Sequence, residues 1–146
     1  PEISKWREEG GKKILEMTKP DHDPVFKAMQ YLKDSGPKTL FFDFACSRTE
    51  VGKDFYVFLD QLKIYLSEHP GKQVTLYGHA DNRGSEEANY YCSQERAEFV
   101  KTQLMQSGID EMQIQVEAMG DDYPVASNES PEGRQMNRRV EISVPV

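Results

Sequence analysis

The sequence predicts an α/β fold in two layers, with a four-stranded sheet covered on one face by two main helices. Four short segments have strand-like patterns of apolar residues, and two longer segments carry apolar residues at helical spacing. These segments follow one another as strand, helix, strand, helix, strand, long loop and strand. Since two amphipathic helices are enough to cover one face of such a sheet, we expect a two-layer sandwich.

The first 37 residues differ in pattern from the rest of the chain. Residues 3–17 carry apolar residues at loosely helical spacing, which two consecutive glycines interrupt. Residues 24–37 predict a short helix, because a proline stands at its start and a glycine and a proline stand at its end. We therefore expect residues 1–37 to form an N-terminal helical extension or linker, and residues 38–146 to form one domain.

The first strand and the first helix of this domain are predicted over residues 39–44 and 50–68. The strand has aromatic and apolar residues on both faces, and the helix ends at the His-Pro-Gly turn of residues 69–71. One apolar stripe marks the side of the helix that should face the sheet. The stripe consists of Phe55, Phe58, Leu59, Leu62 and Leu66.

The second half of the domain continues with a strand over residues 72–79, in which apolar and polar residues alternate. Ser85 is a favourable N-cap for the next helix, and the two glutamates that follow it suit the positive end of the helix dipole. That helix should end near Gly108, a typical C′ residue. Residues 113–118 and 138–144 alternate as two further strands, separated by a long loop.

Charge is distributed unevenly along the chain. The net charge of −7 argues against a nucleic-acid partner, which would require a basic surface. Residues 71–146 carry 13 acidic and 7 basic residues, yet five arginines gather in this acidic half: Arg83, Arg96, Arg134, Arg138 and Arg139. A basic patch on an acidic domain indicates recognition of a discrete anionic group, and a set of surface ion pairs is the alternative.

Membrane-spanning and metal-binding segments are not predicted. The sequence has no run of about eighteen apolar residues, so we expect no membrane insertion by this chain. It begins at Pro1 without an apolar leader, and we expect a processed or excised piece of a longer protein. The Asp21-His22-Asp23 cluster has no further ligand at useful spacing, so it predicts a solvated linker. Neither a metal nor another cofactor is expected.

The two cysteines, Cys46 and Cys92, lack the spacing and the neighbouring histidines of a zinc site. They could form one disulfide in an oxidising compartment. We expect two free thiols instead, because Cys92 falls at a core-like position of the second helix, where cysteine behaves as a small hydrophobic residue.

Arg96 falls on the inward stripe of the second helix, where a buried unpaired charge would be costly. Asp81 closes the preceding strand, and its turn should come back over the first turns of the helix, so the two side chains can converge. Together they could hold a zwitterionic ligand, since the carboxylate accepts from an ammonium and the guanidinium donates to a carboxylate. Asp43 would join them if the first two strands lie side by side. From the residues alone, an internal salt bridge between Asp81 and Arg96 is an equal alternative.

Three stretches in order carry a resemblance to a known family. They are FFDF at residues 41–44, GHADNRGSEEANYYCSQERAEFVKTQL at 78–104 and GDDYPVASNESPEGRQMNRRVEI at 120–142. Together they resemble the OmpA-like peptidoglycan-binding domain, a family that includes the C-terminal parts of Pal lipoproteins and MotB stator proteins. The resemblance extends over roughly residues 38–144 and implies a mixed sheet of four strands over two helices.

The resemblance also implies the site residues. Asp81 and Arg96 occupy the positions that bind the meso-diaminopimelate side chain of the peptidoglycan stem peptide. Asp43 and Phe44 would line the same pocket, and Asn89 would support it. Supporting positions are also expected at Arg83, Gly84, Arg134 and Arg138. The alternative for the arginines at 134, 138 and 139 is that they fix only the long loop and the last strand. Cys92 departs from the family, which usually has leucine at this position.

The function implied is non-catalytic: a periplasmic module that tethers an outer-membrane or other envelope protein of a Gram-negative cell to peptidoglycan. One alternative is a cell-wall hydrolase that uses Asp43 and Asp81 as a carboxylate pair. An Asp81 that faces Arg96 should stay ionised, which argues against a general acid there. The other alternative is a protein–protein interaction module of the Tol–Pal kind, with other envelope proteins as partners.

Overall fold

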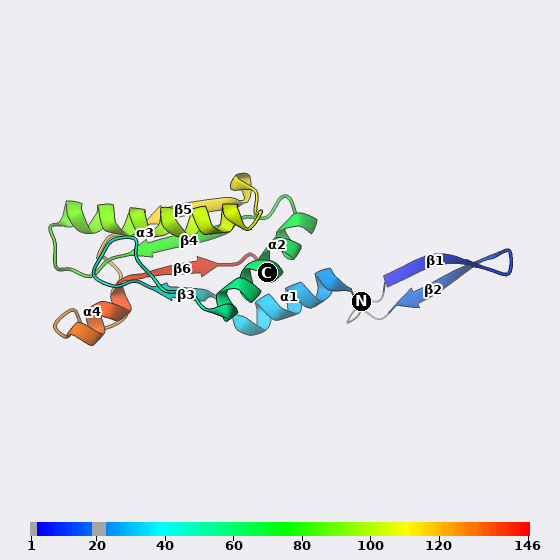
Figure 1. Cartoon of the computed structure of the whole chain (residues 1–146), viewed down its shortest axis with the longest axis horizontal. Helices are drawn as coiled ribbons and strands as arrows, with labels where there is room; N and C mark the ends of the chain where they lie inside the picture. The colour runs from blue at the N-terminus through cyan, green and yellow to red at the C-terminus, as the bar shows by residue number, and fades with distance from the viewer. Residues whose placement is uncertain (1–2, 19–22) are drawn as a thin grey trace.

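The computed structural model describes residues 3–18 and 23–146, and its body is a four-stranded mixed sheet (Figure 1). The strands lie in the order β3 (Lys38–Phe41), β6 (Arg139–Ser143), β4 (Val74–His79) and β5 (Ile114–Ala118). The central strands β6 and β4 are antiparallel, β3 is antiparallel to β6, and β5 is parallel to β4. The predicted fold class is confirmed.

Two helices, α2 (Lys53–Glu68) and α3 (Glu86–Gln106), cover one face of this sheet. Val74 and Leu76 of β4 are fully buried on that face. The next inward position of β4 is Gly78, where an added Cβ atom would collide with the backbone of Ser93 on α3. The glycine therefore lets α3 lie directly on the strand that leads to the candidate site.

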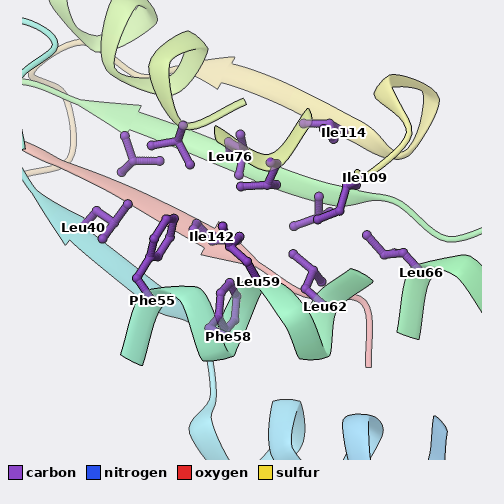
Figure 2. Packing of buried hydrophobic residues seen from close by; sticks show 14 of the residues in the cluster. Leu40, Phe55, Phe58, Leu59, Leu62, Leu66, Leu76, Ile109, Ile114 and Ile142 are labelled. Carbon is purple, nitrogen blue, oxygen red and sulfur yellow. The ribbon is translucent and has the colours of Figure 1, made fainter. Parts of the chain in front are cut away.

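The hydrophobic core lies between the sheet and the two helices α2 and α3. All five residues of the predicted apolar stripe are buried, and Figure 2 shows them on the side of α2 that faces the sheet. Each fully buried side chain of this kind contributes about 1.5–3 kcal/mol relative to an exposed one. The stripe predicted from helical spacing is thus the surface that fixes α2 on the sheet.

The helix α1 (Pro24–Ser35) confirms the short helix predicted before the domain. Asp23 caps it, because its Oδ1 accepts hydrogen bonds from the backbone N–H groups of Val25 at 2.7 Å and Phe26 at 3.3 Å. The helix packs on α2 and contributes Ala28 and Leu32 to the core. From residue 24 onward, the predicted extension therefore packs onto the domain.

The helical interpretation of residues 3–17 was wrong. These residues form an antiparallel hairpin of β1 (Ile3–Glu9) and β2 (Lys12–Thr18), joined by Gly10 and Gly11. Both glycines have positive φ, 58° and 77°, as the tight turn of a two-residue hairpin requires. The glycine pair that seemed to interrupt a helix is therefore the turn. The residues at 21 and 22 of the predicted linker lie outside the described ranges.

Two short elements were absent from the prediction. The 3₁₀ helix η2 (Glu111–Gln113) precedes β5, and α4 (Pro131–Asn137) lies within the predicted long loop. Ser130 caps α4 by accepting from the N–H of Gly133 at 3.0 Å, and Pro131 occupies its first turn. A serine cap followed by proline was the available signal for this helix. In the described part of the chain, no helix is long and apolar enough to cross a membrane.

The expectation of two free thiols was also wrong, since Cys46 and Cys92 form a disulfide with Cα atoms 4.8 Å apart. Ser93, one position further along α3, holds the fully buried place in the helix. Cys92 is only half-buried, so it does not have the core position that favoured a free thiol. It is bonded instead to the loop of residues 42–52, which connects β3 to α2 and is called the β3–α2 loop below.

Candidate functional site

A cavity of about 480 Å³ lies between the β3–α2 loop, the turn after β4 and the first half of α3. We call it the Arg96 cavity. Most of the site residues predicted from the sequence line it: Phe44, Asp81, Arg83, Gly84, Asn89, Arg96 and Arg138. Segments far apart in the sequence thus converge on one pocket.

Arg96 is 2% exposed and lies on the inward side of α3, as its spacing predicted. Its Nη1 donates to the carbonyl oxygen of His79 at 3.0 Å, and its guanidinium lies 5.8 Å from the ring centre of Phe42. Its buried Nε has no hydrogen-bond partner among residues 3–18 and 23–146. Burial lowers the pKa of Arg96 to about 10, although the nearby charge of Asp81 opposes this shift. The group stays charged at neutral pH.

Asp81 forms its ion pair with Arg138, not with Arg96 as the sequence had suggested. Its Oδ2 accepts from Nη1 of Arg138 at 2.9 Å, and its Oδ1 accepts from the backbone N–H of Arg83 at 3.1 Å. Asp81 acts on Arg96 only as a neighbouring charge that favours the protonated guanidinium. The internal Asp81–Arg96 salt bridge offered as an alternative is therefore not formed.

Arg138 is held on three sides. In addition to Asp81, its Nε donates to the carbonyl oxygen of Phe42 at 3.1 Å and its Nη2 donates to Oε1 of Gln135 at 2.9 Å. The side chain thereby ties the end of β3 and the helix α4 to the turn after β4. Sequence reasoning gave Arg138 only a supporting place, because its contact with Asp81 depends on strand order.

Asn89 shapes the turn that carries Asp81. Its Oδ1 accepts from the N–H of Gly84 at 3.1 Å, and its Nδ2 donates to the Gly84 carbonyl at 3.1 Å and to Oδ2 of Asp121 at 3.0 Å. A Cβ atom added to Gly84 would lie 2.8 Å from Asn89 Oδ1. Asn89 therefore fixes the shape of the turn, and Gly84 leaves room for the Asn89 side chain.

Phe44 and Arg83 form the rim of the cavity. Phe44 is 67% exposed, and the guanidinium of Arg83 lies 5.0 Å from the centre of its ring. This distance is within the range of a cation–π contact. An exposed aromatic side chain at a pocket mouth offers apolar surface to a ligand.

Two predicted site residues lie outside the cavity. Asp43 pairs with the exposed Arg48 at 3.4 Å, and its charge acts on Arg96 only as a smaller effect that favours the protonated guanidinium. The strand β6 lies between β3 and β4, so the ends of these two strands are not neighbours. Arg134 donates to the carbonyl of Asn128 at 3.0 Å. Arg139 likewise donates to the carbonyl of Tyr123 at 3.0 Å. Arg134 and Arg139 therefore hold the long loop in place, which is the structural role considered for them as an alternative to ligand binding.

The chemistry of the cavity is that of a binding site. Three guanidinium groups and one carboxylate line it, so it suits an anionic or zwitterionic ligand with at least one carboxylate. Asp81 lines this cavity, whereas Asp43 lines a separate pocket beside Arg48, which argues against the carboxylate pair of the hydrolase hypothesis. Within the described ranges, no group of three or more histidine, cysteine, aspartate or glutamate side chains could hold a metal ion.

Comparisons with known proteins point in one direction. The sequence model of the OmpA family matches residues 44–138. The probable lipoprotein YiaD of Escherichia coli is 36% identical over 59% of this chain and 39% of its own length. The peptidoglycan-binding protein ArfA of Mycobacterium tuberculosis is 40% identical over 61% of this chain and 27% of its own. The chain thus spans less than half the length of these two relatives.

A solved structure of a peptidoglycan-associated protein is also similar to this chain. The peptidoglycan-associated lipoprotein from Burkholderia pseudomallei superimposes with a TM-score of 0.63 at 30% sequence identity. The match covers 73% of this chain and 88% of that protein.

Proposed function

This chain belongs to the OmpA family, and from that premise we propose that it binds peptidoglycan through the Arg96 cavity and tethers an envelope protein to the cell wall. Two similar proteins support the ligand class by name, one as peptidoglycan-binding and one as peptidoglycan-associated. The place of action is then the periplasmic side of the outer membrane in a Gram-negative cell, in keeping with the similar outer membrane porin F of Pseudomonas fluorescens.

The single observation that carries this proposal is the state of Arg96. A guanidinium that is 2% exposed, with a buried Nε lacking a partner in the described chain, lines a cavity large enough for an amino-acid side chain. Arginine offers N–H donors in a planar arrangement that matches a carboxylate, so a ligand carboxylate in the cavity could accept from this guanidinium. Unlike Arg134 and Arg139, which share a buried Nε without a partner in the described chain, Arg96 lines this cavity.

The ligand group that fits best is the diaminopimelate side chain of a stem peptide. Its terminal carbon carries an ammonium and a carboxylate, so one end of the ligand matches both signs of charge in the cavity. The carboxylate would accept from Arg96, and the ammonium would donate to Asp81. Each oxygen of Asp81 already accepts one hydrogen bond within the chain and can accept a second from the ligand. Such a small polar ligand should bind weakly, on the order of micromolar to millimolar.

Co-sedimentation with purified sacculi of the diaminopimelate type tests the function. The 146-residue chain should pellet with the sacculi, and no soluble muropeptides should be released. Arg96→Ala should remain in the supernatant. Lys72→Ala is the matched control, because it also removes one positive charge but lies before β4, at the opposite end of that strand from Asp81. Release of muropeptides by the unaltered chain would establish an enzyme and overturn the proposal.

A further inference from the structure

The β3–α2 loop forms one wall of the Arg96 cavity, and its two ends are held in the core. Phe42 is fully buried, and its N–H donates to the carbonyl oxygen of Arg138 at 2.7 Å. At the other end, Val51 packs against the core cluster. The residues between them supply Phe44, Ala45 and Cys46 to the cavity lining. The wall is therefore a span of loop between two fixed ends.

The middle of this loop has few ties to the rest of the protein. Within the part of the chain that the structure describes, the hydrogen bonds of residues 43–50 are made to one another or to Phe41. Asp43, for example, donates its N–H to the Arg48 carbonyl at 3.2 Å and accepts from the N–H of Ala45 at 3.0 Å. The cation–π contact of Phe44 with Arg83 joins two side chains at the cavity mouth. Hydrogen bonds therefore do not fix this segment against α3.

The disulfide supplies the missing attachment. Cys46 lies two residues after Phe44, and Cys92 lies one helical turn before Arg96 on α3. Both cysteines line the cavity. The bond thus holds the wall against the turn of α3 from which Arg96 projects.

We propose that the Cys46–Cys92 disulfide makes ligand binding in the Arg96 cavity dependent on oxidation, an inference that rests on the function proposed above. In the oxidised chain the wall that carries Phe44 stays in place. In the reduced chain the ends of the loop remain packed, residues 43–50 move away from α3, and the cavity loses this wall. The core, which neither cysteine joins, keeps its fold.

The reduction is ordinary thiol–disulfide exchange with a dithiol reductant. Its thiolate attacks one sulfur of the bond, forming a mixed disulfide and releasing the other cysteine, which takes up a proton. The second thiol of the reductant then closes on the first, releasing the remaining cysteine as a thiol. Two electrons and two protons pass to the protein, and the reductant becomes a disulfide. Cys46 and Cys92 are both half-buried, so a small dithiol can reach them.

The test compares binding of the 146-residue chain to diaminopimelate-type sacculi before and after reduction with dithiothreitol. We expect the affinity to fall by about tenfold or more. A tenfold loss is expected if only about a tenth of the reduced molecules have residues 43–50 in the position that completes the cavity. The Cys46→Ser/Cys92→Ser variant should bind as weakly and should not respond to the reductant. Reoxidation of the unaltered chain should restore binding. Circular dichroism should stay the same, while hydrogen exchange should rise in residues 43–50 only.

Other results of these experiments would overturn the inference, and they also show whether the proposed function fails with it. Equal binding of the oxidised and reduced chains would overturn this inference and leave the proposed function intact. Global unfolding on reduction would also overturn it, because the core must remain folded. Phe44→Ala in the oxidised chain tests the wall independently of the bond, and unchanged binding by this variant would show that the wall does not matter. If the oxidised chain fails to bind sacculi, the proposed function is wrong and this inference falls with it.

Discussion

Asp81 and Arg138 form a buried ion pair because the register of two strands brings them to the same edge of the sheet. β4 and β6 are antiparallel, and His79 lies opposite Arg139. Residues that follow the first strand and precede the second must therefore meet. The carboxylate and the guanidinium are 2.9 Å apart, and each side chain is 9% exposed.

Among the residues that the structure describes, this pair leaves Arg96 without a carboxylate in direct contact. Asp81 is near enough to favour the charged guanidinium, and the guanidinium lines the cavity. The cavity therefore separates two tasks. Arg138 holds Asp81 in place, and we propose that Arg96 recognises the ligand.

Replacement of Arg96 should abolish binding with little loss of fold. Arg96→Ala removes the donor to the ligand carboxylate, and leaving such a group desolvated without a partner costs about 2–5 kcal/mol. Binding to sacculi should fall on the order of thirtyfold or more, as 1.4 kcal/mol corresponds to a factor of ten. Calorimetry with a stem peptide measures the loss. Arg96→Lys keeps the charge but lacks the planar fork, so we expect it to recover binding only in part.

Replacement of Arg138 should damage stability more than replacement of Arg96. Arg138→Ala leaves the Asp81 carboxylate buried without its partner, and breaking a buried pair from one side typically costs about 3–5 kcal/mol. Urea unfolding should show a large drop in midpoint. The double variant Asp81→Asn/Arg138→Gln removes both charges and should recover part of this stability, although it should not bind sacculi. If the single and double variants were equally unstable, the ion pair would not be the cause.

His79 should make the stability of the domain depend on pH. The pKa of His79 lies below its ordinary value of 6.5, because burial and the charge of Arg139 disfavour the protonated ring, while Glu141 opposes this in part. Below about pH 6.5 the unfolded chain takes up a proton that the folded chain resists, so stability falls as the pH falls. The slope for one such group is at most about 1.4 kcal/mol per pH unit.

The measurement is urea unfolding between pH 5 and pH 8 for the unaltered chain and for His79→Gln. The unaltered chain should lose stability toward the acidic end of this range, and the variant should lose less. Since the carbonyl of His79 accepts from Arg96, the backbone contact of the site is kept in the variant. Parallel pH curves for the two proteins would contradict a lowered pKa at His79.

Much of the fold was accessible from the sequence because local patterns encode it. Helical spacing placed α2 and its buried stripe, and Ser85 placed the start of α3. The hairpin of residues 3–18 was missed because two glycines can interrupt a helix or make a turn, and only pairing between the strands decides. Periodicity in so short a segment does not distinguish the two.

The sequence predicted most of the residues that line the cavity, but not which of them contact one another. Asp81 and Arg96 are close in sequence, so a strand, a turn and a helix were enough to bring them together. The role of Arg138 depends on β6 lying beside β4, and the exclusion of Asp43 depends on β6 lying between β3 and β4. Strand order is a long-range property that no local pattern reports. The disulfide was missed for a related reason, since a shift of one residue decides whether Cys92 or Ser93 faces the core.

Discrimination between two stem peptides provides the sharpest test of the site. A lysine-type peptide keeps the side-chain ammonium of a diaminopimelate type but lacks its terminal carboxylate. Asp81 would still have its ligand donor, whereas the buried guanidinium of Arg96 would gain no carboxylate partner. Sites built around a polar ligand group reject the analogue that lacks it far more strongly than apolar pockets reject a missing methylene.

We therefore expect the lysine-type peptide to bind more weakly by about 2–5 kcal/mol, similar to the effect of Arg96→Ala. Calorimetry with both peptides on both proteins gives a complete cycle. In Arg96→Ala the preference for diaminopimelate should disappear, because nothing remains to recognise the carboxylate. Equal affinity of the unaltered chain for the two peptides would mean that Arg96 does not contact this carboxylate. Its burial beside Phe42 and the His79 carbonyl would then serve the packing of α3 on β4.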